Sequence, residues 1–110
     1  MGADLVGSAA SVQAGRSVSI SDDGSTIAFG EPYSNANGTS SGQTKVYAWS
    51  GSDWVLRGSV IVGEAAADES GSAVSLSEDG LTVAVGSFAN DGAGTSAGHV
   101  RIFDYNGLQW

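Results

Sequence analysis

The sequence contains one pattern twice, and this repeat limits the possible folds of the chain more than any other feature. Residues 6–54 align without a gap with residues 62–110 when position n is laid over position n + 56, so that Trp54 meets Trp110. A period of this size is typical of solenoids, propellers and arrays, whose units bury their apolar faces against neighbouring units. Two units are too few to complete such a structure. The identities include Gly15 with Gly71, Val18 with Val74, Asp23-Gly24 with Asp79-Gly80, and Gly30 with Gly86.

The start of each unit predicts a β-hairpin. Residues 17–21 alternate strictly between polar and apolar side chains, and residues 26–29 are β-branched and apolar, which is typical of strands. Between them, residues 21–24 supply a tight turn whose last residue, Gly24, can adopt a positive φ. The first two strands of the unit are therefore expected to pair with each other.

The end of the unit predicts a second hairpin. Residues 45–49 and 54–57 have strand composition and are joined by a turn at residues 50–53. Four antiparallel strands per unit make a propeller blade, so we predict an all-β chain of two four-stranded antiparallel propeller blades. The 17 glycines and the scarcity of helix-forming residues agree with this fold class.

The repeat also sets the unit boundaries. We assign residues 1–57 to the first blade, together with an N-terminal segment that contributes to the last blade of a neighbouring chain, and residues 58–110 to the second blade. Residues 60–70 are expected to cross from one blade to the next. The helix-friendly residues 63–70 are interpreted as a loop or a single turn, because eight residues are short for a helix.

One family shares the order of motifs in this chain. Gly71-x-x-Val74, Ser77-x-Asp79-Gly80, residues 83–86, Asn90-Asp91-Gly92 and residues 98–103 follow one another. This succession resembles the FG-GAP repeat of integrin-α-type β-propellers over almost the whole chain, and the first unit is similar with fewer matches. The resemblance implies a propeller and no particular activity, because propellers include enzymes, lectins and adhesion modules.

The chain departs from that family at its hairpin turns. The integrin-like turn often carries a calcium site of the Asp-x-Asp-x-Asp-Gly kind, whereas this chain has only two short turns, at residues 21–24 and 77–80. Calcium takes six to eight oxygen ligands, which a two-residue hairpin tip cannot provide, so we expect no metal. The residues Asp23, Gly24, Asp79 and Gly80 are interpreted as structural turns whose carboxylates accept hydrogen bonds from nearby backbone N–H groups.

Charge and composition exclude several classes of partner. The formal net charge of −8 repels nucleic acid and acidic membrane surfaces. The chain has no cysteine, which excludes a disulfide framework and a cysteine-ligated zinc site. No apolar run approaches the length of a membrane span, so a soluble protein is expected. Its localisation stays open, and an extracellular parent protein is compatible with the resemblance.

Catalytic signals are weak. His99 is the only histidine, and Gln43 stands at its place in the first unit. Serines are abundant, but no Gly-x-Ser-x-Gly motif is present. We therefore expect no enzymatic activity, no catalytic residue and no cofactor.

Two features leave ligand binding open. The loop residues Asn35, Asn37, Asn90 and Asp91 are weak candidates for contact with a cation or a sugar. Aromatic side chains cluster on the third and fourth strands, where we expect them to pack between blades or cover their edges. Stacking on sugar rings is the alternative. The aromatic residues concerned are Tyr47, Trp49, Trp54, Phe103, Tyr105 and Trp110.

The ends of the sequence predict self-association. The second blade reaches only the first residue of its fourth strand, Trp110, while Met1 corresponds by the offset to Arg57. A neighbouring copy can therefore supply Met1 to Val6 beside Trp110, which makes Met1, Leu5, Val6 and Trp110 the expected oligomer junction. An open pair of blades exposes apolar faces and unpaired edges, which proteins avoid by closing the ring. We expect head-to-tail contacts that close, with a six-bladed trimer first and an eight-bladed tetramer second.

Three hypotheses about function follow. The first is a self-assembling propeller fragment, excised or engineered from a longer repeat protein. The second is a binding module for glycans or an extracellular protein. The third is a single all-β domain of another kind, such as a sandwich of the two units, which predicts a monomer.

Overall fold

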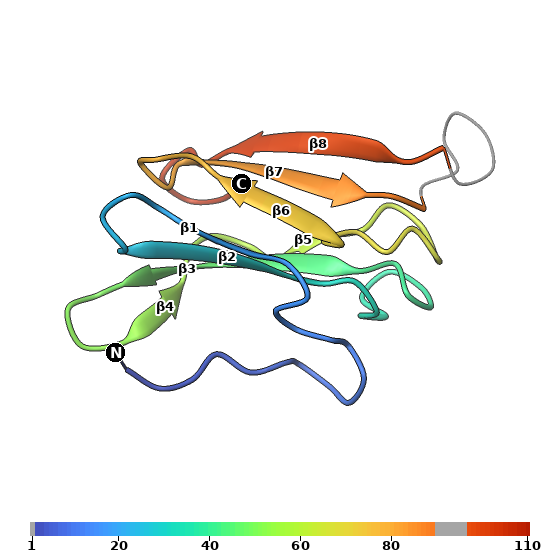
Figure 1. Ribbon diagram of the computed structural model, residues 1–110, viewed down its shortest axis with the longest axis horizontal. Coiled ribbons are helices and arrows are strands. Elements are labelled where there is room, and N and C mark those ends of the chain that lie inside the picture. The colour runs from blue at the N-terminus through green and yellow to red at the C-terminus, as the bar shows by residue number, and fades with distance from the viewer. Residues whose placement is uncertain (1, 90–96) are drawn as a thin grey trace.

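The computed structural model describes residues 2–89 and 97–110, which form two antiparallel sheets and no helix. Figure 1 shows the sheets stacked, with the N-terminal segment running along the far side of the first sheet. The first sheet has the order β1 (Val18–Ile20), β2 (Thr26–Glu31), β3 (Gln43–Trp49) and β4 (Trp54–Leu56), and β5 (Ile61–Val62) also pairs with β3. The second sheet has the order β6 (Ala73–Leu76), β7 (Thr82–Ser87) and β8 (His99–Asp104).

The all-β class and the antiparallel pairing predicted from the sequence are confirmed. The two sheets also share one register. Val18 pairs with Phe29 across β1 and β2, and the residues 56 positions later, Val74 and Val85, pair across β6 and β7. Thr26 pairs with Ala48 as Thr82 pairs with Asp104. The described residues of one chain do not form a closed ring of sheets.

Residues 60–70 lead from the first sheet to the second, and within them Ile61 and Val62 form a short strand that the sequence did not predict. They form β5 and pair with Thr44 and Gln43, so β4 and β5 lie one after the other along the same edge of β3. The reason is burial, because the Ile61 side chain is only 5% exposed and belongs to the core.

Trp110, which the sequence predicts to be the first residue of a truncated fourth strand, packs its ring against Tyr105 as its counterpart Trp54 packs against Trp49 at the start of β4. Trp110 lies outside any strand. Its indole Nε1 donates a hydrogen bond to the Arg57 carbonyl at 2.8 Å, and its ring packs against Tyr105. This indole is therefore held by the chain that leaves the first sheet.

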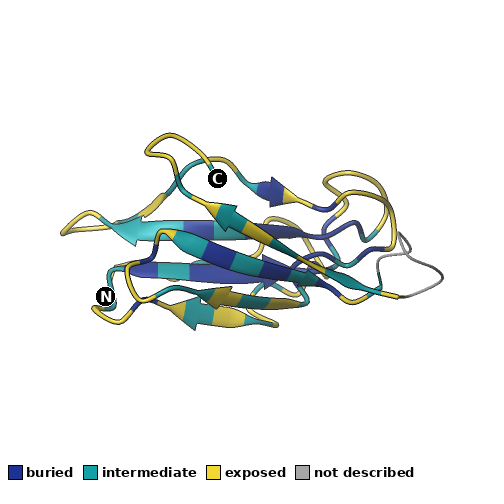
Figure 2. Cartoon of the chain, turned by 90° about the horizontal axis from the view of Figure 1, so that it is seen from above, coloured by how far each residue is buried: buried dark blue, intermediate teal, exposed yellow. Residues whose placement is uncertain are grey.

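The core lies between the two sheets. Small and β-branched side chains of the first sheet face valines of the second, and Figure 2 shows the buried residues gathered on the central strands while the loops are mostly exposed. The backbones come closest where β6 lies beside β1 and β2, and β8 lies farthest from the first sheet (Figure 1), so the sheets fan apart. The buried cluster consists of Ala28, Val46, Ile61, Val83 and Val85, flanked by Val74, Leu76, Phe103 and Trp110.

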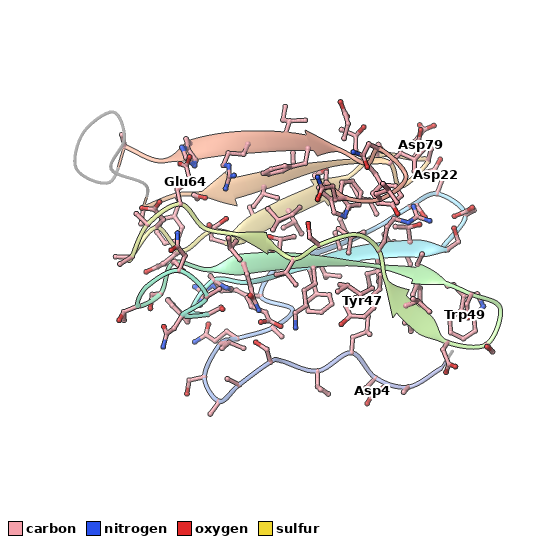
Figure 3. The ribbon with its side chains drawn as sticks, turned by 180° about the vertical axis from the view of Figure 1, so that it is seen from behind. Asp4, Asp22, Tyr47, Trp49, Glu64 and Asp79 are labelled. Carbon is pink, nitrogen blue, oxygen red and sulfur yellow. The ribbon has the colours of Figure 1, made fainter. Side chains whose placement is uncertain are left out.

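Hydrogen bonds fix the sheets to each other at their closest strands. The Ser19 hydroxyl accepts a bond from the Leu76 N–H at 3.0 Å, and the Ser17 hydroxyl donates to the Gly71 carbonyl at 2.9 Å. At the turns, the Asp22 N–H donates to the Glu78 carbonyl at 3.1 Å. The two turns consequently lie at the same end of the molecule, where Figure 3 labels Asp22 and Asp79.

Candidate interaction surface

The two acidic turns are held by their own hydrogen bonds. Asp23 Oδ1 accepts bonds from the Ser25 hydroxyl at 2.7 Å, the Ser25 N–H at 2.9 Å and the Ser21 hydroxyl at 2.9 Å, and these bonds lower the pKa of Asp23. Asp79 is held in the same way by the Ser77 hydroxyl and the Leu81 N–H, which lower its pKa. Gly24 and Gly80 both have positive φ, at 75° and 73°. Each carboxylate therefore closes a turn.

The asparagines considered as ligand contacts make bonds within the protein. Asn35 Oδ1 accepts a bond from the Ser40 N–H at 2.9 Å. The Asn37 amide donates to the carbonyls of Gly63 and Glu64, both at 3.0 Å, and so ties the β2–β3 loop to the chain after β5. Asn90 and Asp91 lie outside the described residues.

The aromatic side chains contact one another. Trp49 and Trp54 meet edge to face at 5.3 Å between ring centroids, and their repeat counterparts Tyr105 and Trp110 meet at 5.2 Å. Tyr47 stacks on Phe29 at 5.8 Å. Figure 3 shows Tyr47 pointing from the first sheet towards the N-terminal segment that carries Asp4.

The N-terminal segment, residues 2–17, has the same backbone form as residues 58–73. Positive φ values recur 56 positions apart, at Ser11 and Ala67 (63° and 64°) and at Gly15 and Gly71 (82° and 89°). Its packing recurs too. A Cβ added to Gly2 would meet the rings of Trp49 and Trp54, and one added to Gly58 would meet those of Tyr105 and Trp110. The N-terminal segment therefore lies against the first sheet as residues 58–73 lie against the second.

A buried carboxylate fastens the N-terminal segment to the first sheet. Glu31 is fully buried, and its Oε2 accepts bonds from the Ser8 hydroxyl and the Gln43 amide, both at 2.6 Å. Its Oε1 lies 3.3 Å from Lys45 Nζ. Burial alone would raise the pKa of Glu31, but the bonds from Ser8 and Gln43 and the charge of Lys45 outweigh it and hold the pKa below 4.5.

In the second unit the carboxylate of the equivalent contact lies on the preceding segment and not on the sheet. Ser87 stands at the position of Glu31, and Glu64 stands at the position of Ser8. Glu64 Oε1 lies 3.3 Å from Nε2 of His99, the counterpart of Gln43. Each unit thus carries one carboxylate between the sheet and the segment that precedes it.

The lowered pKa of Glu31 predicts an acid-dependent contribution to stability. Its folded pKa lies below the unfolded value, so its contribution is present above about pH 4.5 and is lost as the pH falls through the folded pKa. We expect the difference in unfolding free energy between the unsubstituted chain and Glu31→Gln to shrink as the pH falls below about 4.5. Urea denaturation across this range measures it, and a constant difference would contradict the assignment.

Each sheet leaves one apolar face exposed. Val100 and Ile102 on β8 are 67% and 70% exposed, whereas their counterparts Thr44 and Val46 are 0% and 1% exposed because the second sheet covers them. On the first sheet the relation is reversed. Val18 and Ile20 on β1 are 57% and 56% exposed, whereas their counterparts Val74 and Leu76 pack on the core. Each exposed face therefore matches a face that is covered within the chain.

A depression of about 410 Å³ lies on the exposed face of the second sheet. An adjoining apolar depression of about 160 Å³ shares Ala73, Gly86 and Val100 with it. The sequence predicts exposed apolar faces, but it did not predict this depression. The available signal was Gly86, since a glycine within a strand marks a place where another backbone approaches closely. The larger depression is lined by Ser72, Ala73, Gly86, Ser87, Phe88, Ala97, Gly98, His99 and Val100.

Within residues 2–89 and 97–110, no group of three or more acidic or histidine side chains gathers as metal ligands would. The described part of the chain also contains no helix long and apolar enough to cross a membrane. No protein-family model matches the sequence, and a search of the curated proteins found no relative. The exposed sheet faces and the depression are thus the surface on which a functional proposal rests.

Proposed function

We propose that this chain is a self-assembling two-blade unit of a β-propeller, similar to FG-GAP repeats, whose activity is to associate head to tail with copies of itself. The observation that carries this proposal is the match between exposed and covered faces. The β8 face with Val100 and Ile102 corresponds to the face that the second sheet covers within the chain. The β1 face with Val18 and Ile20 corresponds to the face of the second sheet, with Val74 and Leu76, that packs against the first sheet. One copy therefore offers both halves of an interface, and such heterologous contacts form closed rings when the rotation fits.

The fan-like packing of the sheets supports a propeller over a sandwich. In a sandwich, two sheets face each other across a layer of even thickness of about 10 Å. Here the sheets are closest at β1, β2 and β6 and separate towards β8. Radial repetition of such wedges builds a propeller of four to eight blades.

The free edge of β8 supports the same assembly. Within the chain, Gln43 pairs with Val62 and Thr44 with Ile61. The corresponding residues 56 positions away are His99 with Val6 and Val100 with Leu5. Val6 is 74% exposed, and β8 pairs only with β7 among the described strands. Residues Leu5 and Val6 of a second copy are thus expected to complete the edge of β8.

The mass under native conditions tests the proposal. We expect assemblies that are multiples of the 11.0 kDa chain, with three copies as the principal species and four as the second candidate. Native mass spectrometry and sedimentation across a dilution series measure this. A chain that stays monomeric at high concentration would overturn the proposal.

A further inference from the structure

We infer that the depression on the second sheet is the seat for the backbone of Ala14 and Gly15 from a second copy, with Gly86 as the floor of the contact. This inference rests on the proposed self-assembly and names the contact that would make it specific. It follows from an equivalent contact that is already formed inside the chain. The occupant is therefore identified by the repeat and not by the shape of the depression alone.

The formed contact lies between Gly30 on β2 and Gly71 before β6. A Cβ added to Gly30 would lie only 1.8 Å from the Gly71 carbonyl oxygen, and one added to Gly71 would lie 2.6 Å from the Gln43 carbonyl oxygen. Side chains are excluded from both positions by backbone atoms. Glycine at each position therefore allows the two sheets to approach.

Neighbouring backbone bonds hold this contact in place. The Ser70 N–H donates to the Ser41 carbonyl at 2.9 Å, and the Gly63 N–H donates to the Gly42 carbonyl at 2.9 Å. A Cβ on Gly63 would lie 1.9 Å from the Ser41 carbonyl oxygen. Residues 63–71 therefore sit on the β2–β3 loop with almost no space between the two backbones.

The equivalent contact of the second sheet is open. Gly86 occupies the position of Gly30, and the nearest atom to a Cβ added there is the Cβ of Ala73, at 3.5 Å. Gly15 occupies the position of Gly71, and nothing lies within 4 Å of a Cβ added there. Both glycines thus have room that their counterparts lack.

A backbone hydrogen bond already positions Gly15 for the contact. Its N–H donates to the Gly30 carbonyl at 3.2 Å, as the Gly71 N–H donates to the Gly86 carbonyl at 3.0 Å. The side of Gly15 that remains free is the one by which Gly71 meets Gly30. Placed on a second copy, this side would face Gly86.

The lining of the depression matches the same occupant. Ser41 and Gly42, which receive the backbone of residues 63–70, correspond to Ala97 and Gly98 in the lining. Gly63 and Ser70 correspond to Gly7 and Ala14. One bond is missing, because Ala73 stands where the Ser17 hydroxyl donates to the Gly71 carbonyl. We therefore expect the contact between copies to be weaker than the one within the chain.

Substitution of Gly86 by alanine tests the inference. Within one chain the added methyl group meets only Ala73 at ordinary contact distance, so the fold is expected to persist. Against Gly15 of a second copy the methyl group would clash with a backbone carbonyl. We expect Gly86→Ala to keep the circular dichroism spectrum of the unsubstituted chain and to weaken association at least about tenfold, measured by sedimentation.

Gly51→Asn is the control for adding a side chain at a glycine with nothing within 4 Å; its φ of 104° favours glycine, and asparagine is tolerated there better than most side chains. It is expected to associate as the unsubstituted chain does. If the unsubstituted chain assembles and Gly86→Ala assembles equally well, the seat is wrong while the self-assembly stands. If the unsubstituted chain is monomeric, both the seat and the self-assembly are overturned. Association lost equally in Gly51→Asn would also overturn the seat, because the loss would not be specific to Gly86.

Discussion

Gly30→Ala is expected to destabilise the chain by about 3 kcal/mol, the upper end of the usual cost of overfilling a packed interior. The added Cβ would lie within 1.8 to 2.8 Å of three backbone atoms of Gly71, and backbone cannot rotate away as a side chain can. The sheets must therefore separate where they are now closest. Urea denaturation followed by tryptophan fluorescence measures the loss as a lower transition midpoint.

Gly86→Ala is the matched control for this effect, because it adds the same methyl group at the same position of the other repeat. The two substitutions are expected to affect different properties of the protein. Gly30→Ala disrupts the packing of the single chain, whereas Gly86→Ala leaves it and affects association. An unchanged midpoint for Gly30→Ala would show that the two sheets do not approach at Gly30 and Gly71 as described.

Glu31→Ala is expected to cost about 3–5 kcal/mol, the usual cost of removing one partner of a buried ion pair. Lys45, whose side chain is 14% exposed, would lose its carboxylate partner, and Ser8 and Gln43 would lose their acceptor. For a domain of this size the loss is a large part of the total stability. Chemical denaturation measures it at neutral pH.

Ser87→Ala is the control, because it truncates the counterpart of Glu31 without removing a charge. We expect it to cost clearly less than Glu31→Ala. Equal losses would contradict the role of the carboxylate and assign the effect to packing alone. Proteolysis within residues 2–17 provides a second readout, since loss of the Ser8 bond is expected to expose that segment.

The sequence was sufficient to predict the fold class, the antiparallel hairpins and the repeat register, because these depend on local alternation and on turn residues such as Gly24. It did not predict β5. Two residues are too short for a strand pattern, and Ile61 and Val62 pair with β3 only because β4 has already brought the chain to that edge.

The candidate surface was harder to predict than the fold. The sequence placed weak ligand contacts at Asn35 and Asn37, but the Asn35 side chain bonds within its own loop and the Asn37 side chain bonds to the chain after β5. It did not distinguish Gly86 from other glycines, since the meaning of that position depends on how closely Gly30 and Gly71 approach in three dimensions. The repeat alignment shows that Gly86 is equivalent to Gly30. Only the close approach of the two sheets at Gly30 shows that a backbone can pack directly on such a glycine.

The reversed placement of the carboxylate has a consequence for how the two repeats could evolve. Joining the N-terminal segment with Ser8 to a sheet carrying Ser87 would leave the contact without an acid, and joining Glu64 to Glu31 would bring two acids together. The first removes the charged hydrogen-bond acceptor from the contact, and the second sets like charges against each other. The repeats are therefore not interchangeable modules, and recombination between them would be penalised unless both sides of this contact were exchanged together.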